Sequence, residues 1–234
     1  MGGTFYTHHQ CARQTCVLTI KSVPYSPSND ELIVAVNPAS GAAQGSVSKV
    51  QAHQDGTWHA TIHCWILDQD RRLIFQSRSL TKATFPGLWD VSAAGHLRPG
   101  EDGLREVEEE LGAIVTLEEL TSVGVLTVDQ HYGELFNRER PRVYLWDSGR
   151  ALDSFSFTDG EVTALLSINI VSLVKLLQGE VVPALAYDTK GLYETSLNIN
   201  NVVPLSNEYW NTLLESLYKA VPDSQVGPAP APAH

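Results

Sequence analysis

The chain has 234 residues, of which 43% are hydrophobic and 18% are charged, and its formal net charge is −11. This length fits one domain of ordinary size with peripheral additions, and the composition is that of a soluble globular protein. The negative charge argues against a nucleic-acid backbone as partner, and no apolar run approaches the length of a membrane span.

Three cysteines, Cys11, Cys16 and Cys64, are present. A low, odd number argues against a disulfide framework and predicts a reducing, cytoplasmic location. Residues 1–29 contain no Asp or Glu, which leaves organellar import as an alternative. The sequence does not predict an oligomeric state.

Secondary structure can be predicted in chain order. Residues 1–30 are expected to be a partly ordered extension that ends in a Pro- and Ser-rich loop. Apolar runs bounded by turn residues predict strands at 31–36, 60–67, 72–76 and 143–146. Helical spacing predicts helices at 103–111, capped by Asp102, and at 170–177 and 207–220. Residues 79–94 are expected to be loop with short strand content. This mixture favours an α/β sandwich.

The predicted helix at 103–111 is rich in glutamate. Glu106, Glu109 and Glu110 stand at i, i+3 and i+4 and share one face of the helix. Apolar residues repeat on the opposite face, namely Leu104, Val107, Leu111 and Ile114. Clustered carboxylates repel one another, and a hard divalent cation is the usual way to hold them together. The alternative is an ordinary solvated helix face.

This segment resembles the Nudix box, G-x5-E-x7-R-E-U-x-E-E-x-G-U, in which U is aliphatic. The matching residues are Gly95, Glu101, Arg105, Glu106, Glu109, Glu110 and Gly112. Three residues separate Glu101 from Arg105 where the box has seven. The box is therefore shortened by about one helical turn, roughly 6 Å of helix.

The resemblance extends beyond the box to the isopentenyl-diphosphate isomerase-like branch of the Nudix superfamily. Similar segments lie at 58–66, 73–78, 85–90, 137–139, 143–144 and 159–162, within residues 31–210. The resemblance implies a Nudix-type α/β/α sandwich with a mixed central β-sheet. We expect this domain to cover residues 31–225 and to be followed by a disordered Pro/Ala tail at 226–234.

The resemblance also implies roles for individual residues. Glu106, Glu109 and Arg105 would be catalytic, and Glu106, Glu109, Glu110 and Glu139 would bind Mg²⁺ or Mn²⁺. Gly95, Glu101 and Gly112 would be structural. Arg105 normally pairs with the first glutamate of the box, here Glu101. The shortened gap leaves that pair open in this chain: the two residues could meet at i, i+4 if the helix starts early, although the intervening Gly103 weakens such a helix.

A second metal site is implied by the same branch. Its histidine positions fall on His53, His59 and His96, together with Glu139. The alternative is that these are ordinary polar residues of loops and strands. His63 is expected to be a packed strand residue and not a ligand.

These features predict metal-dependent hydrolysis of a phosphoanhydride bond in a small-molecule diphosphate. Double-bond isomerisation is an alternative, although the catalytic cysteine of that family falls on Ala94, which carries no acid. A catalytically silent binding module is a third reading, because the box is shortened. Nothing in the sequence dictates the substrate.

Overall fold

The computed structural model describes residues 31–157 and 160–221. The predictions for the extension at 1–30 and the tail at 226–234 lie outside these residues. The strands are β1 Leu32–Val36, β2 Ala43–Ser48, β3 His59–Asp68, β4 Leu73–Arg78, β5 Trp89–Asp90, β6 Ala93–His96, β7 Leu120–Val125, β8 Val128–Tyr132, β9 Leu135–Arg150, β10 Val162–Ile168, β11 Val182–Asp188 and β12 Gly191–Leu197. The helices are α1 Lys49–Asp55, α2 Arg105–Leu111, α3 Ile170–Leu177 and α4 Asn207–Ala220. Short 3-10 turns lie at Leu117–Glu119, Leu152–Ser154 and Ile199–Asn201.

The strands join in one sheet whose central path runs β12-β11-β10-β4-β3-β1-β2. The long strand β9 pairs with β3 in parallel and with β7 and β8 in antiparallel fashion. The remaining pairs along the path are antiparallel, so the sheet is mixed.

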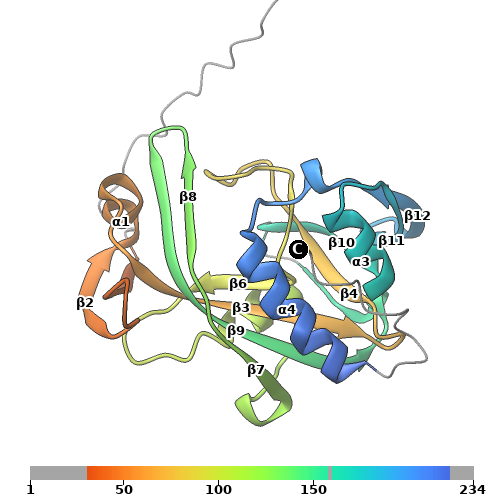
Figure 1. The fold of residues 1–234 in the computed structure, drawn as a ribbon, viewed down its shortest axis with the longest axis horizontal. Coiled ribbons are helices and arrows are strands. Elements are labelled where there is room, and N and C mark those ends of the chain that lie inside the picture. The colour runs from red at the N-terminus through yellow and green to blue at the C-terminus, as the bar shows by residue number, and fades with distance from the viewer. Residues whose placement is uncertain (1–30, 158–159, 222–234) are drawn as a thin grey trace, which may run out of the picture.

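Helices cover both faces of this sheet. Alternate side chains of β3 point to opposite faces. Trp65 packs in a cluster with the apolar residues of α3 and α4, whereas Cys64 packs in another with those of α2. Figure 1 shows α3 and α4 lying across one face of the sheet. The predicted α/β/α sandwich with a mixed sheet is confirmed.

Several elements match the sequence-based expectations. Helices α3 and α4 have the predicted bounds, and each is capped by a side chain, Asn169 or Ser206, that accepts a backbone N–H of the first turn. Strand β3 contains the strand expected at 60–67, and β4 begins at Leu73, one residue later than the strand expected at 72–76. The two strands pair directly only at Leu67 and Leu73, because β6 pairs with β3 and β5 pairs with β4 beyond that point.

The helix of the acidic segment differs from the prediction in two ways. It begins at Arg105, and Asp102 accepts a hydrogen bond from the Leu104 amide before the helix starts, so it is not the cap. The helix ends at Leu111, as predicted, because Gly112 caps it in a left-handed conformation with φ of 62°, so the apolar face stops before Ile114. Ile114 is therefore 75% exposed.

Candidate active site and metal centre

The three glutamates of α2 have different surroundings. Glu110 is buried and accepts hydrogen bonds from the Ala94 amide (3.0 Å) and from Gln76 Nε2 (3.2 Å). Glu106 lies directly over Gly95, where a Cβ atom would come within 2.0 Å of its carboxyl carbon. The Glu109 side chain is 52% exposed. The glycine of the box is thus required so that Glu106 can approach β6.

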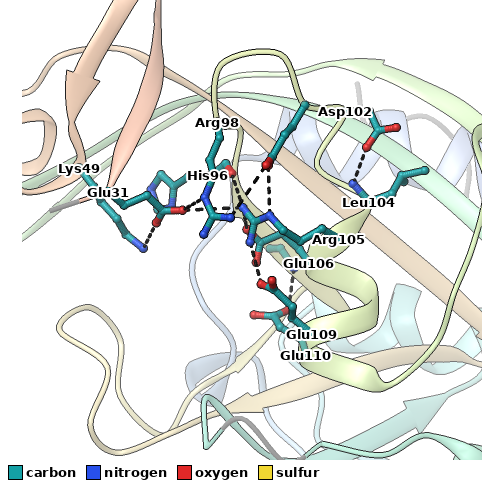
Figure 2. A network of polar contacts seen from close by, with 12 residues as sticks. Glu31, Lys49, His96, Arg98, Asp102, Leu104, Arg105, Glu106, Glu109 and Glu110 are labelled. Atoms are coloured by element: carbon teal, nitrogen blue, oxygen red, sulfur yellow. Dashed lines mark hydrogen bonds and ion pairs between the residues drawn. The ribbon is translucent and has the colours of Figure 1, made fainter. Parts of the chain in front are cut away.

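Arg105 connects Glu106 and Glu109, as Figure 2 shows. Its guanidinium lies 3.1 Å from Glu101, 2.9 Å from Glu106 and 2.7 Å from Glu109. Of the alternatives left open by the shortened gap, the structure has Arg105 and Glu101 paired at i, i+4, although the helix begins only at Arg105. Gly103, with φ of +89°, bends the chain so that Glu101 lies within reach although it precedes the helix.

The acidic site carries unbalanced negative charge. Burial raises the pKa of Glu106 to about 7, although the charge of Arg105 opposes the rise. Burial likewise raises the pKa of Glu110 to about 8, against the effect of the hydrogen bond from Ala94. These shifts mean that both carboxylates are withdrawn from water without enough positive charge nearby, a condition that a bound cation would relieve.

The structure brings the three predicted histidines together. His53 comes from α1, His59 from β3 and His96 from β6, and their ligand atoms all lie within 4.8 Å of one another. No other trio of His, Cys, Asp or Glu within the described ranges is as close. Strands β3 and β6 pair in antiparallel fashion with Thr61 opposite His96. His59 is two residues before Thr61 and therefore lies on the same face of β3, next to His96.

Backbone carbonyl groups orient two of the imidazoles. His53 Nδ1 lies 2.9 Å from the Phe136 carbonyl, and His59 Nδ1 lies 2.9 Å from the Thr57 carbonyl. Donation from Nδ1 leaves Nε2 as the acceptor that can bind a metal. His59 Nε2 is buried and has no hydrogen-bond partner among the described residues, and His53 Nε2 lies 3.2 Å from His96 Nε2. Loss of water contact lowers the pKa of His53 and His96, which favours their neutral, metal-binding form.

Glu139 lies beside this histidine cluster, since it is the register partner of His59 across the parallel pair β3–β9. Its Oε2 atom lies 3.3 Å from His63 Nε2 and 3.4 Å from Thr61 Oγ1. Burial alone would raise the pKa of Glu139, but the His63 hydrogen bond and the neighbouring imidazoles outweigh it and hold the pKa well below its usual range. The carboxylate is therefore ionised next to three nitrogen donors.

The two groups of residues lie on opposite sides of β6. Gly95 is the register partner of Ile62 and faces α2, whereas His96 is the partner of Thr61 and faces the histidine cluster. Neighbouring residues of one short strand thus contribute to an acidic site and to a histidine site.

Sequence reasoning missed part of the polar network. His63 is a buried strand residue, as predicted, but its partners Tyr209 and Glu139 were not foreseen. The period of two in β3 could have indicated that His59, Thr61 and His63 share a face. Cys64 points the other way into an apolar cluster, where burial raises its pKa to about 12, so it cannot replace a catalytic cysteine.

Comparison with known proteins defines the family. The NUDIX domain matches residues 57–184. An uncharacterized Nudix hydrolase of Clostridium acetobutylicum is 33% identical over 186 residues, which are 74% of this chain and 90% of that protein. The chain therefore belongs to the Nudix family.

Two further proteins are similar over parts of their length. An isopentenyl-diphosphate delta-isomerase of Serratia proteamaculans is 33% identical over 120 residues, which are 50% of this chain and 65% of that protein. The crystal structure of DR0079 from Deinococcus radiodurans has a TM-score of 0.46 and 19% identity, and it covers 64% of this chain and 91% of that chain. None of the helices that the structure describes is long and apolar enough to cross a membrane.

Proposed function

We propose that this protein is a metal-dependent Nudix hydrolase that cleaves a phosphoanhydride bond in a small-molecule diphosphate. The observation that carries the proposal is a pair of carboxylates packed against β6 at Gly95 and Ala94, namely the largely covered Glu106 and the buried Glu110. Carboxylate oxygens suit a hard cation such as Mg²⁺, and withdrawal from water gives these two groups a need for positive charge. Glu106, Glu109 and Glu110 are the residues that we assign to this cation.

The chemistry follows from charge. When bound, a divalent cation supplies positive charge opposite the phosphate oxygens and the leaving group. We assign to Glu106 the removal of a proton from the attacking water, because its pKa is raised to about 7, the range that suits a general base near neutral pH. Arg105 holds Glu106 and Glu109 in position through its planar guanidinium.

The test uses the full chain with a panel of nucleoside and isoprenoid diphosphates in Mg²⁺. We expect phosphate release by the wild type and a loss of about 100-fold or more in Glu106→Gln, as for removal of a general base. Glu108→Gln is the matched control, because Glu108 is an exposed glutamate of the same helix. Release no greater than that of Glu106→Gln for every substrate would overturn the proposal.

The histidine cluster favours a second candidate, isomerisation of an isoprenoid diphosphate. Three imidazoles with a neighbouring carboxylate, Glu139, form a donor set suited to Mn²⁺ or Zn²⁺. The obstacle is Ala94, which stands where the related isomerases carry their cysteine, while Cys64 faces the apolar core. Deuterium exchange into isopentenyl diphosphate with saturating metal would support this candidate, and its absence would remove it.

A further inference from the structure

A continuous chain of buried hydrogen bonds ends at Glu139. Trp65 Nε1 lies 3.0 Å from Tyr209 Oη, Tyr209 Oη lies 2.8 Å from His63 Nδ1, and His63 Nε2 lies 3.3 Å from Glu139 Oε2. All four residues are buried, with exposed fractions from 0% for Trp65 to 8% for Glu139. Tyr209 comes from α4, 146 positions from His63, so the chain links the helix layer to the edge of the histidine cluster.

The chemistry of the groups fixes the direction of these bonds. The Glu139 carboxylate can only accept, so His63 Nε2 carries a hydrogen and donates it. In the neutral imidazole Nδ1 is then the acceptor, and Tyr209 Oη, which accepts the indole N–H of Trp65, donates its own hydrogen to Nδ1. Tyr209 thus selects the tautomer of His63 that holds the carboxylate.

The carboxylate is held on one side only. Both contacts of Glu139 that the structure gives, from His63 and from Thr61, use Oε2. Across the β3–β9 pair lies His59, whose buried Nε2 has no hydrogen-bond partner in the part of the chain that the structure describes. Anchoring one oxygen while the other stays available is how outer groups orient a metal-binding carboxylate.

We propose that Trp65, Tyr209 and His63 are positioning residues that orient Glu139 as the fourth ligand of a transition-metal ion bound by His53, His59 and His96. The inference rests on the metal use proposed above, but it concerns the histidine side of β6 and not the acidic site. Imidazole nitrogens with one carboxylate suit Co²⁺, Zn²⁺ or Mn²⁺ better than Mg²⁺.

Co²⁺ is the probe, because its visible spectrum reports the number and type of ligands. We expect the wild-type chain to bind Co²⁺ and Tyr209→Phe to bind it about 10- to 100-fold more weakly with a changed spectrum, as for loss of an outer-shell partner. Tyr218→Phe makes the same chemical change on α4, where the Tyr218 hydroxyl forms no hydrogen bond with any described residue, so the affinity of this variant should equal that of the wild type. Glu139→Gln marks the effect of losing the ligand itself.

His63→Gln is a second variant, which keeps the test decisive if Tyr209→Phe does not fold; circular dichroism verifies the fold. This variant should also bind Co²⁺ more weakly, because the glutamine side chain has no ring nitrogen to take the place of His63 Nδ1 in the hydrogen bond with Tyr209. Absence of Co²⁺ binding by the wild type, or wild-type affinity and spectrum in folded Tyr209→Phe or His63→Gln, would overturn the inference. Because these measurements need no substrate, failure of the hydrolase assay in Mg²⁺ is a separate result.

Discussion

Arg105 is the residue on which the acidic side chains of the box depend. Glu101, Glu106 and Glu109 would repel one another, and each lies within 3.1 Å of its guanidinium. The planar group offers five donors in a fixed arrangement, which the point charge of a lysine cannot reproduce. Glu110 is not one of the partners of Arg105, since its carboxyl accepts hydrogen bonds from the Ala94 amide and from Gln76.

The surroundings of Glu110 predict that the stability of the folded protein depends on pH. Burial raises its pKa in the folded protein to about 8 from an ordinary value of 4.5, so the folded state retains a proton that the unfolded state releases. Without metal, the stability that this proton contributes is complete below about pH 4.5 and is lost as the pH rises to about 8. Glu110→Gln has no proton to lose at this position, so its stability should decline less with pH and keep only the part due to Glu106, whose pKa is raised to about 7.

The measurement is the thermal midpoint of both proteins in a chelating buffer between pH 5 and pH 9. Glu108→Gln removes an exposed carboxyl from the same helix and should follow the wild-type profile. Parallel profiles for the wild type and Glu110→Gln would show that the carboxyl is ionised throughout. Mg²⁺ should stabilise the wild type and not Glu110→Gln, because ligand binding to the folded state raises stability by mass action.

At the scale of elements, the turn before α2 allows Arg105 to pair with Glu101 although the box is shortened. Gly103 has φ of +89°, and a Cβ atom there would lie 2.8 Å from Ile62 Cγ2. The turn therefore packs closely on β3 and brings Arg105 back toward Glu101. A side chain at this position would force the turn away from the sheet.

Gly103→Ala should destabilise the protein more than Gly100→Ala. Both glycines have positive φ, so either alanine costs about 1–2 kcal/mol in backbone strain. Only at position 103 does a contact with Ile62 add a packing cost, of about 1–3 kcal/mol. Urea unfolding of the two variants measures the difference, and equal destabilisation would show that the close packing of the turn has no energetic role.

The elements that could be predicted from sequence are those with strong local signals. Helices α3 and α4 combine apolar spacing with a capping side chain. Helix α1 carries His53 but has only one buried residue, Ala52, so its sequence shows no apolar periodicity from which a helix could be predicted. The solvent-facing strand β2 has little apolar content, and the apolar run of β10 cannot be distinguished from a helix by periodicity alone.

The same limit applies to the candidate sites. Spacing within α2 indicates which glutamates share a helix, and the family resemblance indicates the three histidines. Neither reveals that Tyr209 contacts His63, because that contact depends on how α4 packs across the sheet. Likewise, the partner of Glu110 is Gln76 on β4, which no local pattern relates to the box.

At the scale of the whole molecule, the histidine cluster joins a weakly held element to the central sheet. Helix α1 has seven residues and one buried side chain, too little to be stable by itself. His53 connects it to the rest through the Phe136 carbonyl of β9 and through the ring contacts with His59 and His96. A metal ion bound by all three histidines would therefore connect α1 to β3 and β6 and stabilise its position on the sheet.

This linkage predicts that a transition-metal ion protects the backbone of α1. With free Co²⁺ at 100 times its dissociation constant, the amides of Lys49–Asp55 that exchange through detachment of α1 should slow by up to about 100-fold, as mass action requires. Hydrogen exchange with and without Co²⁺ measures the change. His53→Gln should abolish it, because α1 then supplies no ligand, whereas His131→Gln, a change outside the cluster, should retain it. Equal protection in His53→Gln would mean that the ion binds without α1.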